Sequence, residues 1–549
     1  MDDHQRIAEL LFGGLKHDTD YYEKLYPARQ LAKGAQVMRT APSPTGFVHL
    51  GNLYGALADE RIAHQSGGVF YLRIEDTDLK RKVEGAVATI HKTFDYFQIH
   101  FDEGADILPA GAYGPYYQRQ RAEIYQTYAK KLIAQGQAYP CFCTEDDLQQ
   151  IRQRQQAANQ TTGYYGSWAR CRDLTYDQVA ANVAAGRPYV IRMRSTGDVS
   201  RQHVFHDEIK GDITVTENDQ DAVILKTDGI PTYHFAHCID DHLMHTTIVL
   251  RGEEWLGTLN IHQELTAMLG FAPFRYAHTT VLMKMDGDVK RKLSKRKDPE
   301  LALDFYRQLG YHPYAMRIYL LTLLNWNFEE WYLKHPDADI DTFKFSLDKM
   351  GQSGALFDLE KLNSISRTYL SRFSLEQMKD YLSGYLTTNR PQDRARYFSD
   401  EGYLDRILAL GMGLELKKRR KDYIYASQIL DMIAYYFDDA YRPSYQFKFD
   451  KPLTKAIIEG FAAGYDYADD GTAWFAKVKA LTARLGLASE MNEYKAHPEL
   501  YKGSVADVAE TIRVAATGHR NTPDLWSIMQ IMGPDRVRAR LDQALKEAD

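Results

Sequence analysis

The chain of 549 residues has room for about three to four domains, counting roughly 150 residues for each. Its hydrophobic share of 44% and charged share of 26% are those of ordinary folded proteins, so the composition excludes a disordered or fibrous chain. The formal net charge of -6 argues only weakly against nucleic-acid binding, because one basic face on an acidic body is enough to meet phosphates.

Residues 1 to 35 are predicted to form a helical N-terminal extension, because Ile7, Leu10, Leu11 and Leu15 recur at helical spacing. The first residues lack a basic stretch followed by an apolar one, so they do not read as a secretory signal. No uninterrupted apolar run approaches the roughly 20 residues that a bilayer-spanning helix needs. These features predict a cytoplasmic protein.

Residues 36 to 138 alternate short apolar runs with helical patterns, which predicts an α/β unit with a parallel sheet. The run VFYLRIED is expected to be a buried strand, and a helix with Ile124, Tyr128 and Leu132 on one face should end at Gly136. The same character returns over residues 221 to 300 in AVILKTDG, PTYHFAHCIDD and TTIVLRGEEW. Cys238 would lie in one of these strands.

Residues 139 to 220 have a different character and look like an insertion. They combine a Gln-rich helical pattern, the β-like runs PYVIRMRS and DITVTE, and three of the four cysteines, Cys141, Cys143 and Cys171. In a reducing compartment such a cluster suggests a bound metal before a disulfide. The alternative is three reduced cysteines packed as small apolar side chains.

From residue 301 the chain is predicted to be helical. A stripe of apolar residues at helical spacing should face a core: Ile429, Ile433, Tyr436 and Phe437. A basic block could meet nucleic-acid phosphates or simply be a solvated helix end: Lys417, Lys418, Arg419, Arg420 and Lys421. Four nearby tyrosines could stack on unpaired bases or fill a helical core: Tyr423, Tyr425, Tyr435 and Tyr436.

Two short motifs carry chemistry. RTAPSPTGFVHLGN, residues 39 to 52, joins a predicted strand to a helix start, where backbone N–H groups can receive phosphate. His49 and Asn52 would share one helix face, and Gly51 would allow close approach of a nucleotide. Far downstream, the lysines of KLSKR, residues 292 to 296, could close over a triphosphate. Each motif alone also fits an ordinary turn or a solvated basic loop.

Together, HLGN and KLSKR about 240 residues later resemble the paired signatures of class I aminoacyl-tRNA synthetases. RTAPSPTGFVHLGN, LRIEDTD, DGIPTYHFAHCIDDHLMH and VLRGEEWL resemble the glutamyl subgroup, whereas the glutaminyl subgroup typically has PEPNG in place of PSPTG. The resemblance covers about residues 36 to 370 with specific motifs and continues less distinctly beyond them.

The resemblance implies a multidomain α/β plus all-α protein. A Rossmann-like parallel-sheet catalytic domain, residues 36–138 and 221–300, would be split by an inserted α+β acceptor-stem-binding domain, residues 139–220. A helical stem-contact region, residues 301–370, and an α-helical anticodon-binding domain, residues 371–549, would follow. A monomeric enzyme would attach L-glutamate to the 3′ end of tRNA(Glu), using ATP with Mg²⁺ to form glutamyl-adenylate. Charging of tRNA(Gln) as well stays open.

Two alternatives from other classes remain. One is a catalytically silent tRNA-binding or regulatory paralogue, which the intact KLSKR, Arg39, Glu75 and Arg251 argue against. The other is a paralogue that attaches glutamate to a modified anticodon base, and such proteins lack the anticodon-binding half.

The resemblance also assigns residues to roles. Those expected to bind ATP are Thr45, His49, Gly51, Asn52, Lys292, Ser294 and Lys295, of which His49, Asn52, Lys292 and Lys295 would act in catalysis. Those expected to bind glutamate are Arg39, Ser43, Glu75, Tyr233 and Arg251. The chemistry agrees, because two carboxylates need fixed cations and an ammonium needs an anion. For either arginine alone, a surface or structural ion pair is the simpler interpretation, and the shared motif context is what favours the glutamate site.

Two features depart from the family pattern. Asn52 stands where the class usually has a second His, so a neutral amide replaces a protonatable donor. The cysteines resemble a structural zinc knuckle, but tetrahedral zinc takes four ligands. Tyr164, Tyr165 and Asp173 are the candidates for the fourth.

Replacing Lys295 by Ala is expected to slow adenylate formation by a factor of about 100 or more, because a partner of the transition-state charge is lost. Pyrophosphate exchange or single-turnover kinetics measures the effect. A rate equal to that of the unaltered chain would remove Lys295 from the mechanism.

Overall fold

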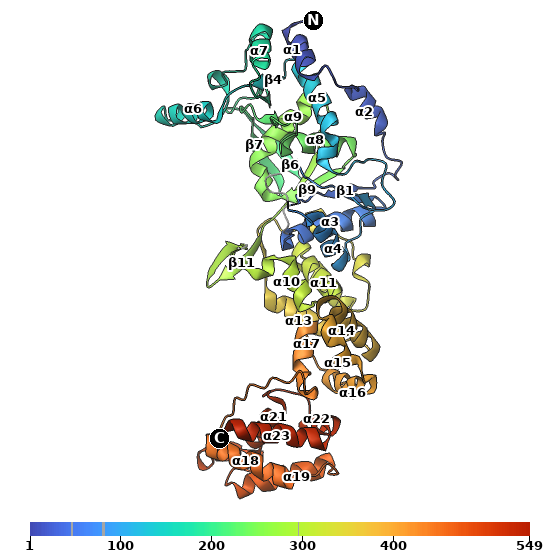
Figure 1. The fold of residues 1–549 in the computed structure, drawn as a ribbon, viewed down its shortest axis with the longest axis vertical. Helices are drawn as coiled ribbons and strands as arrows, with labels where there is room; N and C mark the ends of the chain where they lie inside the picture. The colour runs from blue at the N-terminus through green and yellow to red at the C-terminus, as the bar shows by residue number, and fades with distance from the viewer. Residues whose placement is uncertain (45–47, 79–82, 295, 549) are drawn as a thin grey trace. The chain divides into compact units, whose positions relative to one another are not determined.

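The computed structural model describes residues 1–44, 48–78, 83–294 and 296–548 and forms two compact units. Unit 1 is Met1–Tyr306 with Met316–Asp358, and unit 2 is Arg307–Ala315 with Leu359–Asp549. Figure 1 shows strands and helices mixed in unit 1 and a helical unit 2. No helix within the described ranges is both long enough and apolar enough to cross a bilayer.

A parallel sheet forms the centre of unit 1. Strand β1 (Val37–Thr40) pairs with β2 (Val69–Leu72), which pairs with β3 (Glu103–Gly104). Strand β9 (Ile248–Gly252) pairs in parallel with β10 (Arg275–Thr279). β9 lies beside β1, because the N–H of Thr247, directly before β9, donates to the carbonyl oxygen of Val37 at 3.0 Å. The carboxyl ends of these strands therefore share one edge, where ligands bind in such folds.

Helices cover this sheet and extend it at the N-terminus. The helices of unit 1 outside the insertion are α1 (Asp3–Phe12), α2 (Thr19–Leu25), α3 (Leu50–Gln65), α4 (Ala86–Tyr96), α5 (Ala122–Ala134), α8 (Tyr233–Leu243), α9 (Leu259–Leu269) and α12 (Phe328–Lys334). Glu9 of α1 pairs with Lys130 of α5 at 2.7 Å, and Glu23 of α2 accepts a hydrogen bond from Tyr128 of α5 at 2.7 Å. The first two helices thus pack against the body of unit 1.

The segment expected as an insertion, residues 139–220, contributes antiparallel strands, and one of their sheets includes a strand beyond residue 220. β4 (Ala138–Cys141) pairs with β5 (Val190–Met193), and β5 pairs with β8 (Val223–Leu225). β6 (Gln202–Asp207) and β7 (Gly211–Thr216) form a hairpin with its turn at residues 208–210, and Gly211, which starts β7, has a φ of +73° that suits glycine. The helices here are α6 (Glu145–Ala157) and α7 (Tyr176–Ala184), shown at the upper left of Figure 1.

The prediction that Cys238 lies in a strand is wrong. The segment PTYHFAHCIDD is mostly helix α8, which begins after the extended residue Thr232. Phe235 and Ile239 lie four residues apart and are fully buried, as one face of a core helix requires. Asp240 and Asp241, which follow Ile239, misled the strand prediction, because they too are buried, where arginines neutralise them.

Asp240 on α8 is the centre of a buried charge cluster. Its carboxylate accepts hydrogen bonds from Arg121 at 2.7 Å, Tyr125 at 2.8 Å and Gln118 at 2.9 Å. Arg73 lies 3.8 Å away. Because the side chains of Arg121 and Asp240 are fully buried, each charge depends on the other for compensation.

Unit 2 is a set of helices around one apolar core. They are α13 (Leu359–Leu370), α14 (Leu375–Asn389), α15 (Arg394–Phe398), α16 (Glu401–Met412), α17 (Ala426–Met432), α18 (Lys451–Gly464), α19 (Gly471–Arg484), α20 (Met491–Ala496), α21 (Val505–Thr517), α22 (Leu525–Met532) and α23 (Pro534–Ala548). Helices α10 (Leu303–Leu309) and α11 (Pro313–Leu324) carry residues of both units.

The predicted stripe at residues 429 to 437 is in this core but not in one helix. Ile429, Ile433 and Tyr436 are buried, as expected. Helix α17 ends at Met432, however, and a 3₁₀ turn follows before Phe437 turns extended. Short apolar runs do not reveal such a break, because both geometries bury the same residues.

Replacing Arg121 by Met is expected to destabilise unit 1 by about 3–5 kcal/mol, because the buried Asp240 carboxylate would lose its closest cation and keep only Arg73, 3.8 Å away. Differential scanning fluorimetry measures the fall in melting temperature. The matched control is Arg275→Met, which removes an exposed pair with Glu208 and should cost less than about 1 kcal/mol. Equal losses in both variants would contradict the assignment.

Candidate active site

A cavity of about 620 Å³ opens at the carboxyl edge of the parallel sheet. The residues that the sequence analysis selected and that line this cavity are Arg39, Ser43, His49, Gly51, Asn52, Glu75, Tyr233, Arg251 and Lys292. Ser294 does not line it, and Thr45 and Lys295 lie outside the described residues. The structure therefore gathers residues that are up to about 250 positions apart in the chain.

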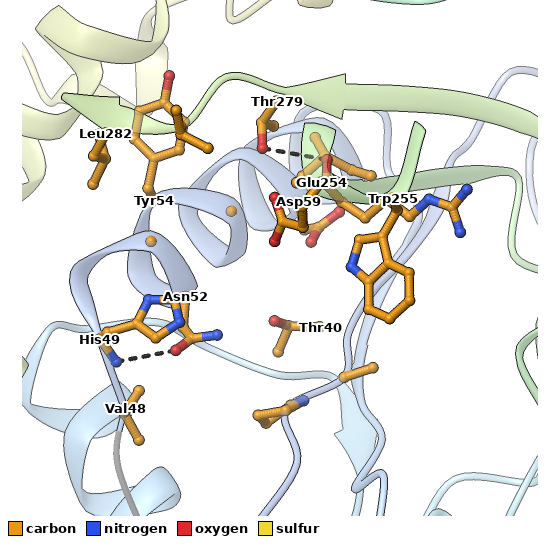
Figure 2. A pocket seen from close by; sticks show the side chains of 18 of the residues that line it. Thr40, Val48, His49, Asn52, Tyr54, Asp59, Glu254, Trp255, Thr279 and Leu282 are labelled. Carbon is orange, nitrogen blue, oxygen red and sulfur yellow. Dashed lines mark hydrogen bonds between the residues drawn. The ribbon is translucent and has the colours of Figure 1, made fainter. Parts of the chain in front are cut away.

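The start of α3 forms one end of the cavity. The His49 backbone N–H donates to the side-chain oxygen of Asn52 at 3.0 Å, so the Asn52 carbonyl is engaged and its NH₂ group is the part left to meet a ligand. Figure 2 shows His49 and Asn52 on the opposite side of the cavity from Trp255. A Cβ on Gly51 would lie 3.0 Å from the His49 ring, so glycine makes room for this histidine.

Arg39, at the end of β1, is a buried cation with a fixed orientation. Its Nε and Nη2 donate to the Asp241 carboxylate at 3.2 and 3.5 Å, and its Nη1 donates to the carbonyl oxygen of Leu250 at 3.0 Å. Burial works against the charged form, but the Asp241 charge raises the pKa of Arg39 above its ordinary value. These three bonds use three of its five N–H groups.

Arg251, at the end of β9, faces the same cavity from the neighbouring strand. Its Nε donates to His278 at 3.0 Å, and its Nη1 lies 3.1 Å from His262 Nδ1. Its Nη2 is buried and has no hydrogen-bond partner within the described part of the chain. A buried guanidinium edge of this kind is suited to a ligand carboxylate.

An anion and two rings complete this end of the cavity. Glu75 accepts a hydrogen bond from Arg73 at 3.3 Å, and burial raises the pKa of its carboxyl group. Tyr233 packs on Trp255, with ring centroids 4.1 Å apart. This end of the cavity thus offers two fixed cations, the Glu75 carboxyl group and a flat aromatic wall.

Sequence reasoning missed Asp59, which lines the cavity from α3. It is buried, its Oδ1 has no partner within the described ranges, and burial raises the pKa of its carboxyl group well above the ordinary value. The signal was an acidic residue in the apolar run LYGALADERIA, three turns from His49. Trp255 was also missed, because nothing in the segment VLRGEEWL indicates that its ring lines the cavity.

Lys292, the first residue of KLSKR, is the last residue of β12 (Val289–Lys292), which forms a hairpin with β11 (Leu282–Asp286). Asp298 anchors the end of this hairpin. Both terminal nitrogens of Arg291 donate to Asp298, at 2.6 and 2.8 Å, and the Ser294 N–H donates to it at 2.8 Å. Chiefly because of Arg291, the pKa of Asp298 lies below its ordinary value. Ser294 is thus engaged with Asp298 at this anchor.

The three clustered cysteines meet around one phenol. The Sγ atoms of Cys143 and Cys171 are 3.7 Å apart, and the Tyr164 hydroxyl lies 3.4 Å from Cys141 Sγ and 3.3 Å from Cys143 Sγ. The three thiols lie within 4.8 Å of one another, a spacing that could hold a metal ion. Hydrogen bonds from Cys143 and Cys171 lower the pKa of Cys141.

The other candidates for a fourth metal ligand point elsewhere. The Tyr165 hydroxyl donates to the carbonyl oxygen of Thr161 at 2.7 Å. Asp173 pairs with Arg194 at 2.8 Å, and its side chain is 84% exposed. Tyr164 is therefore the one candidate of the three that lies among the sulfur atoms.

In unit 2, the basic block and the nearby tyrosines differ in accessibility. Lys417, Lys418 and Arg419 are exposed in the loop after α16, and Arg420 pairs with Asp422. Tyr423, Tyr435 and Tyr436 are buried in the core, which favours the core interpretation of these rings.

Family models match both units. Residues 36–364 match the model described as tRNA synthetases class I (E and Q), catalytic domain, and residues 375–545 match one described as anticodon binding domain. The second match covers the half that the anticodon-modifying paralogues lack.

Relatives match along the whole length. The chain is 49% identical to a glutamate--tRNA ligase of Acetivibrio thermocellus over 99% of this chain and 100% of that one. It is 44% identical to one of Clostridium perfringens strain 13, over 98% and 100%. A crystal structure of a glutamate tRNA ligase from Elizabethkingia meningosepticum in complex with its amino acid is 26% identical, with a TM-score of 0.71 over 94% and 100% of the two chains.

Replacing Asp298 by Ala is expected to loosen the segment after β12, because Arg291 and the Ser294 N–H both lose their acceptor. Limited trypsin digestion, followed by mass spectrometry, should show cleavage after Arg291 and Lys292 about tenfold faster, as more open segments are cut sooner. The control is Asp286→Ala, which removes only the exposed contact to Arg291 Nε. Unchanged cleavage in the Asp298 variant would show that this carboxylate does not anchor the segment.

Proposed function

Since the chain belongs to the class I tRNA synthetase family of the glutamate and glutamine group, we propose that it is a glutamate--tRNA ligase. It joins L-glutamate to the 3′ end of tRNA(Glu) in two steps. The α-carboxylate of glutamate attacks the α-phosphorus of ATP, which forms glutamyl-adenylate and releases pyrophosphate. The terminal ribose hydroxyl of the tRNA then attacks the acyl carbon, and AMP leaves.

The observation that carries this proposal is the placement of Arg39, Arg251 and Glu75 around one cavity with the His49 end of α3. Glutamate bears two carboxylates and one ammonium, and Arg39, Arg251 and Glu75 supply two cations and one anion for them. Glutamine would put a neutral amide against a buried guanidinium, and such a mismatch is expensive enough to select against it.

The chain supplies positioning and charge stabilisation, and no side chain needs to act as a covalent nucleophile. His49 and Asn52 hold the nucleotide at the start of α3, with Gly51 between them. Lys292 and Lys295 stabilise the negative charge that builds on the departing pyrophosphate. Tyr233 and Ser43 complete the amino-acid site. Mg²⁺, bound with ATP, would neutralise phosphate charge.

Unit 2 and the inserted segment are proposed to bind the tRNA. The loop after α16, with exposed Lys417, Lys418 and Arg419 and with Arg420 paired to Asp422, supplies cations to backbone phosphates, and each such contact steepens the salt dependence of binding. The acceptor is tRNA(Glu), and tRNA(Gln) is a second candidate acceptor. The enzyme is proposed to act as a monomer.

The direct test is aminoacylation with purified tRNA(Glu) and tRNA(Gln), each offered radiolabelled glutamate or glutamine with ATP and Mg²⁺. Glutamate should be transferred to tRNA(Glu), and glutamine to neither tRNA. Transfer of glutamine without glutamate would overturn the substrate assignment. No transfer at all would favour the catalytically silent paralogue.

We also propose that Cys141, Cys143, Cys171 and Tyr164 hold one structural Zn²⁺. The donor set suits this metal, because three sulfur ligands and one oxygen ligand complete the four that a closed zinc site takes. The Tyr164 hydroxyl already lies within 3.4 Å of two of the thiols. Bound zinc would link β4 to the segment before α7 and so stiffen the insertion.

Elemental analysis of the purified chain should find one zinc per molecule, and Cys143→Ser should lose it. Tyr164→Phe should release zinc to a chelator at least about tenfold faster. Substitution of a group that holds the metal or orients its ligands typically lowers metal affinity by about that factor or more. The control is Tyr165→Phe, whose hydroxyl bonds only to Thr161 among the described residues. A purified chain that contains no zinc and whose melting temperature does not change when zinc is added would contradict the proposal.

A further inference from the structure

Arg251 is held by two histidines where Arg39 is held by an aspartate. Arg251 Nε donates to His278 Nε2 at 3.0 Å, and Nη1 donates to His262 Nδ1 at 3.1 Å. An arginine can only donate hydrogen bonds, so both of these ring nitrogens must be unprotonated. Two neutral acceptors therefore fix the guanidinium without cancelling its charge.

His278 is itself fixed from behind by Asp207. With Nε2 acting as acceptor, the His278 proton lies on Nδ1, which donates to Asp207 Oδ2 at 2.6 Å. The Asp207 carboxylate also accepts the backbone N–H groups of Ile209 at 3.0 Å, Lys210 at 2.9 Å and His278 at 3.2 Å. All of these bonds hold the buried imidazole in one tautomer and one orientation.

His262 is fixed in the same manner by a different pair of elements. With Nδ1 accepting from Arg251, the His262 proton lies on Nε2 and donates to His234 Nδ1 at 2.8 Å. His262 belongs to α9 and His234 to α8, so this second support is independent of β10. Burial, with the nearby Arg251 charge, lowers the pKa of His262 and of His278, which keeps both rings neutral.

The consequence is an uncompensated cation beside the cavity. Arg251 is 7% exposed, and no carboxylate of the described ranges pairs with it, whereas Arg39 shares its charge with Asp241. The ring of Tyr276 lies 4.6 Å from Cζ of Arg251 and stabilises the cation without supplying a counter-charge. The free Nη2 is left as the edge that meets a ligand.

We propose that His278, backed by Asp207, and His262, backed by His234, are positioning residues that orient Arg251 and thereby set the preference for glutamate over glutamine. This inference rests on the proposed function, in which Arg251 binds a carboxylate of glutamate. An acidic partner in place of either histidine would neutralise Arg251 and weaken the contrast between a carboxylate and an amide.

Two matched pairs of variants test it by aminoacylation of tRNA(Glu). His278→Phe and His262→Leu remove the acceptor, whereas His278→Gln and His262→Asn place an amide oxygen near the lost nitrogen. The first variant of each pair should raise the KM for glutamate about tenfold, as expected for a lost hydrogen bond to a charged group. The ratio of kcat/KM for glutamate to that for glutamine should fall by a similar factor.

The readouts separate positioning from a loss of structure. The KM for ATP and kcat should change less than about twofold. In the amide variants the KM for glutamate should stay close to that of the unaltered chain. His206→Ala, an exposed histidine on the same hairpin as Asp207, should behave as the unaltered chain. If one apolar variant fails to fold, the other pair decides.

Three results would overturn the proposal. They are an unchanged KM for glutamate in both apolar variants, an equal rise in the KM for ATP, and amide variants no better than the apolar ones. Absence of glutamate transfer by the unaltered chain is a different result, because it overturns the proposed function itself.

Discussion

Compensation of buried charge is the constraint on which the catalytic unit depends. Three arginines from separate segments, Arg39, Arg73 and Arg121, converge on the adjacent carboxylates of Asp240 and Asp241 in α8. Because these ions are buried, removing one leaves its partner without compensation, at a cost of several kcal/mol. The arrangement therefore fixes α8 against β1 and β2, and with it the edge of the sheet where the cavity opens.

The same constraint gives the two arginines of the cavity different characters. Arg39 belongs to the ion network, so Asp241 compensates part of its charge before any ligand binds. Arg251 is supported by neutral rings and keeps its charge for the ligand. A pocket with one shared cation and one unshared cation can bind two carboxylates and still distinguish a carboxylate from an amide.

The sequence was informative where a motif places several residues on one element. RTAPSPTGFVHLGN predicted a strand, a turn and a helix start, and the structure has β1 and α3 there. It was uninformative where a role depends on contacts between distant segments. The histidines around Arg251 could not be identified, and Tyr164 could not be chosen over Tyr165 and Asp173, because the partners of these side chains come from other elements. The mistaken strand at Cys238 has the same origin, since buried polar residues obscured a helical pattern.

Binding of two non-hydrolysable adenylate analogues, glutamyl and glutaminyl, tests most directly the claim that fixed buried cations select the amino acid. Isothermal titration calorimetry on the full chain gives both dissociation constants under one condition. The account predicts that the glutamyl analogue binds at least about 100-fold more tightly, because only its side-chain carboxylate can form an ion pair with a buried guanidinium. Equal affinities for the two analogues would contradict it.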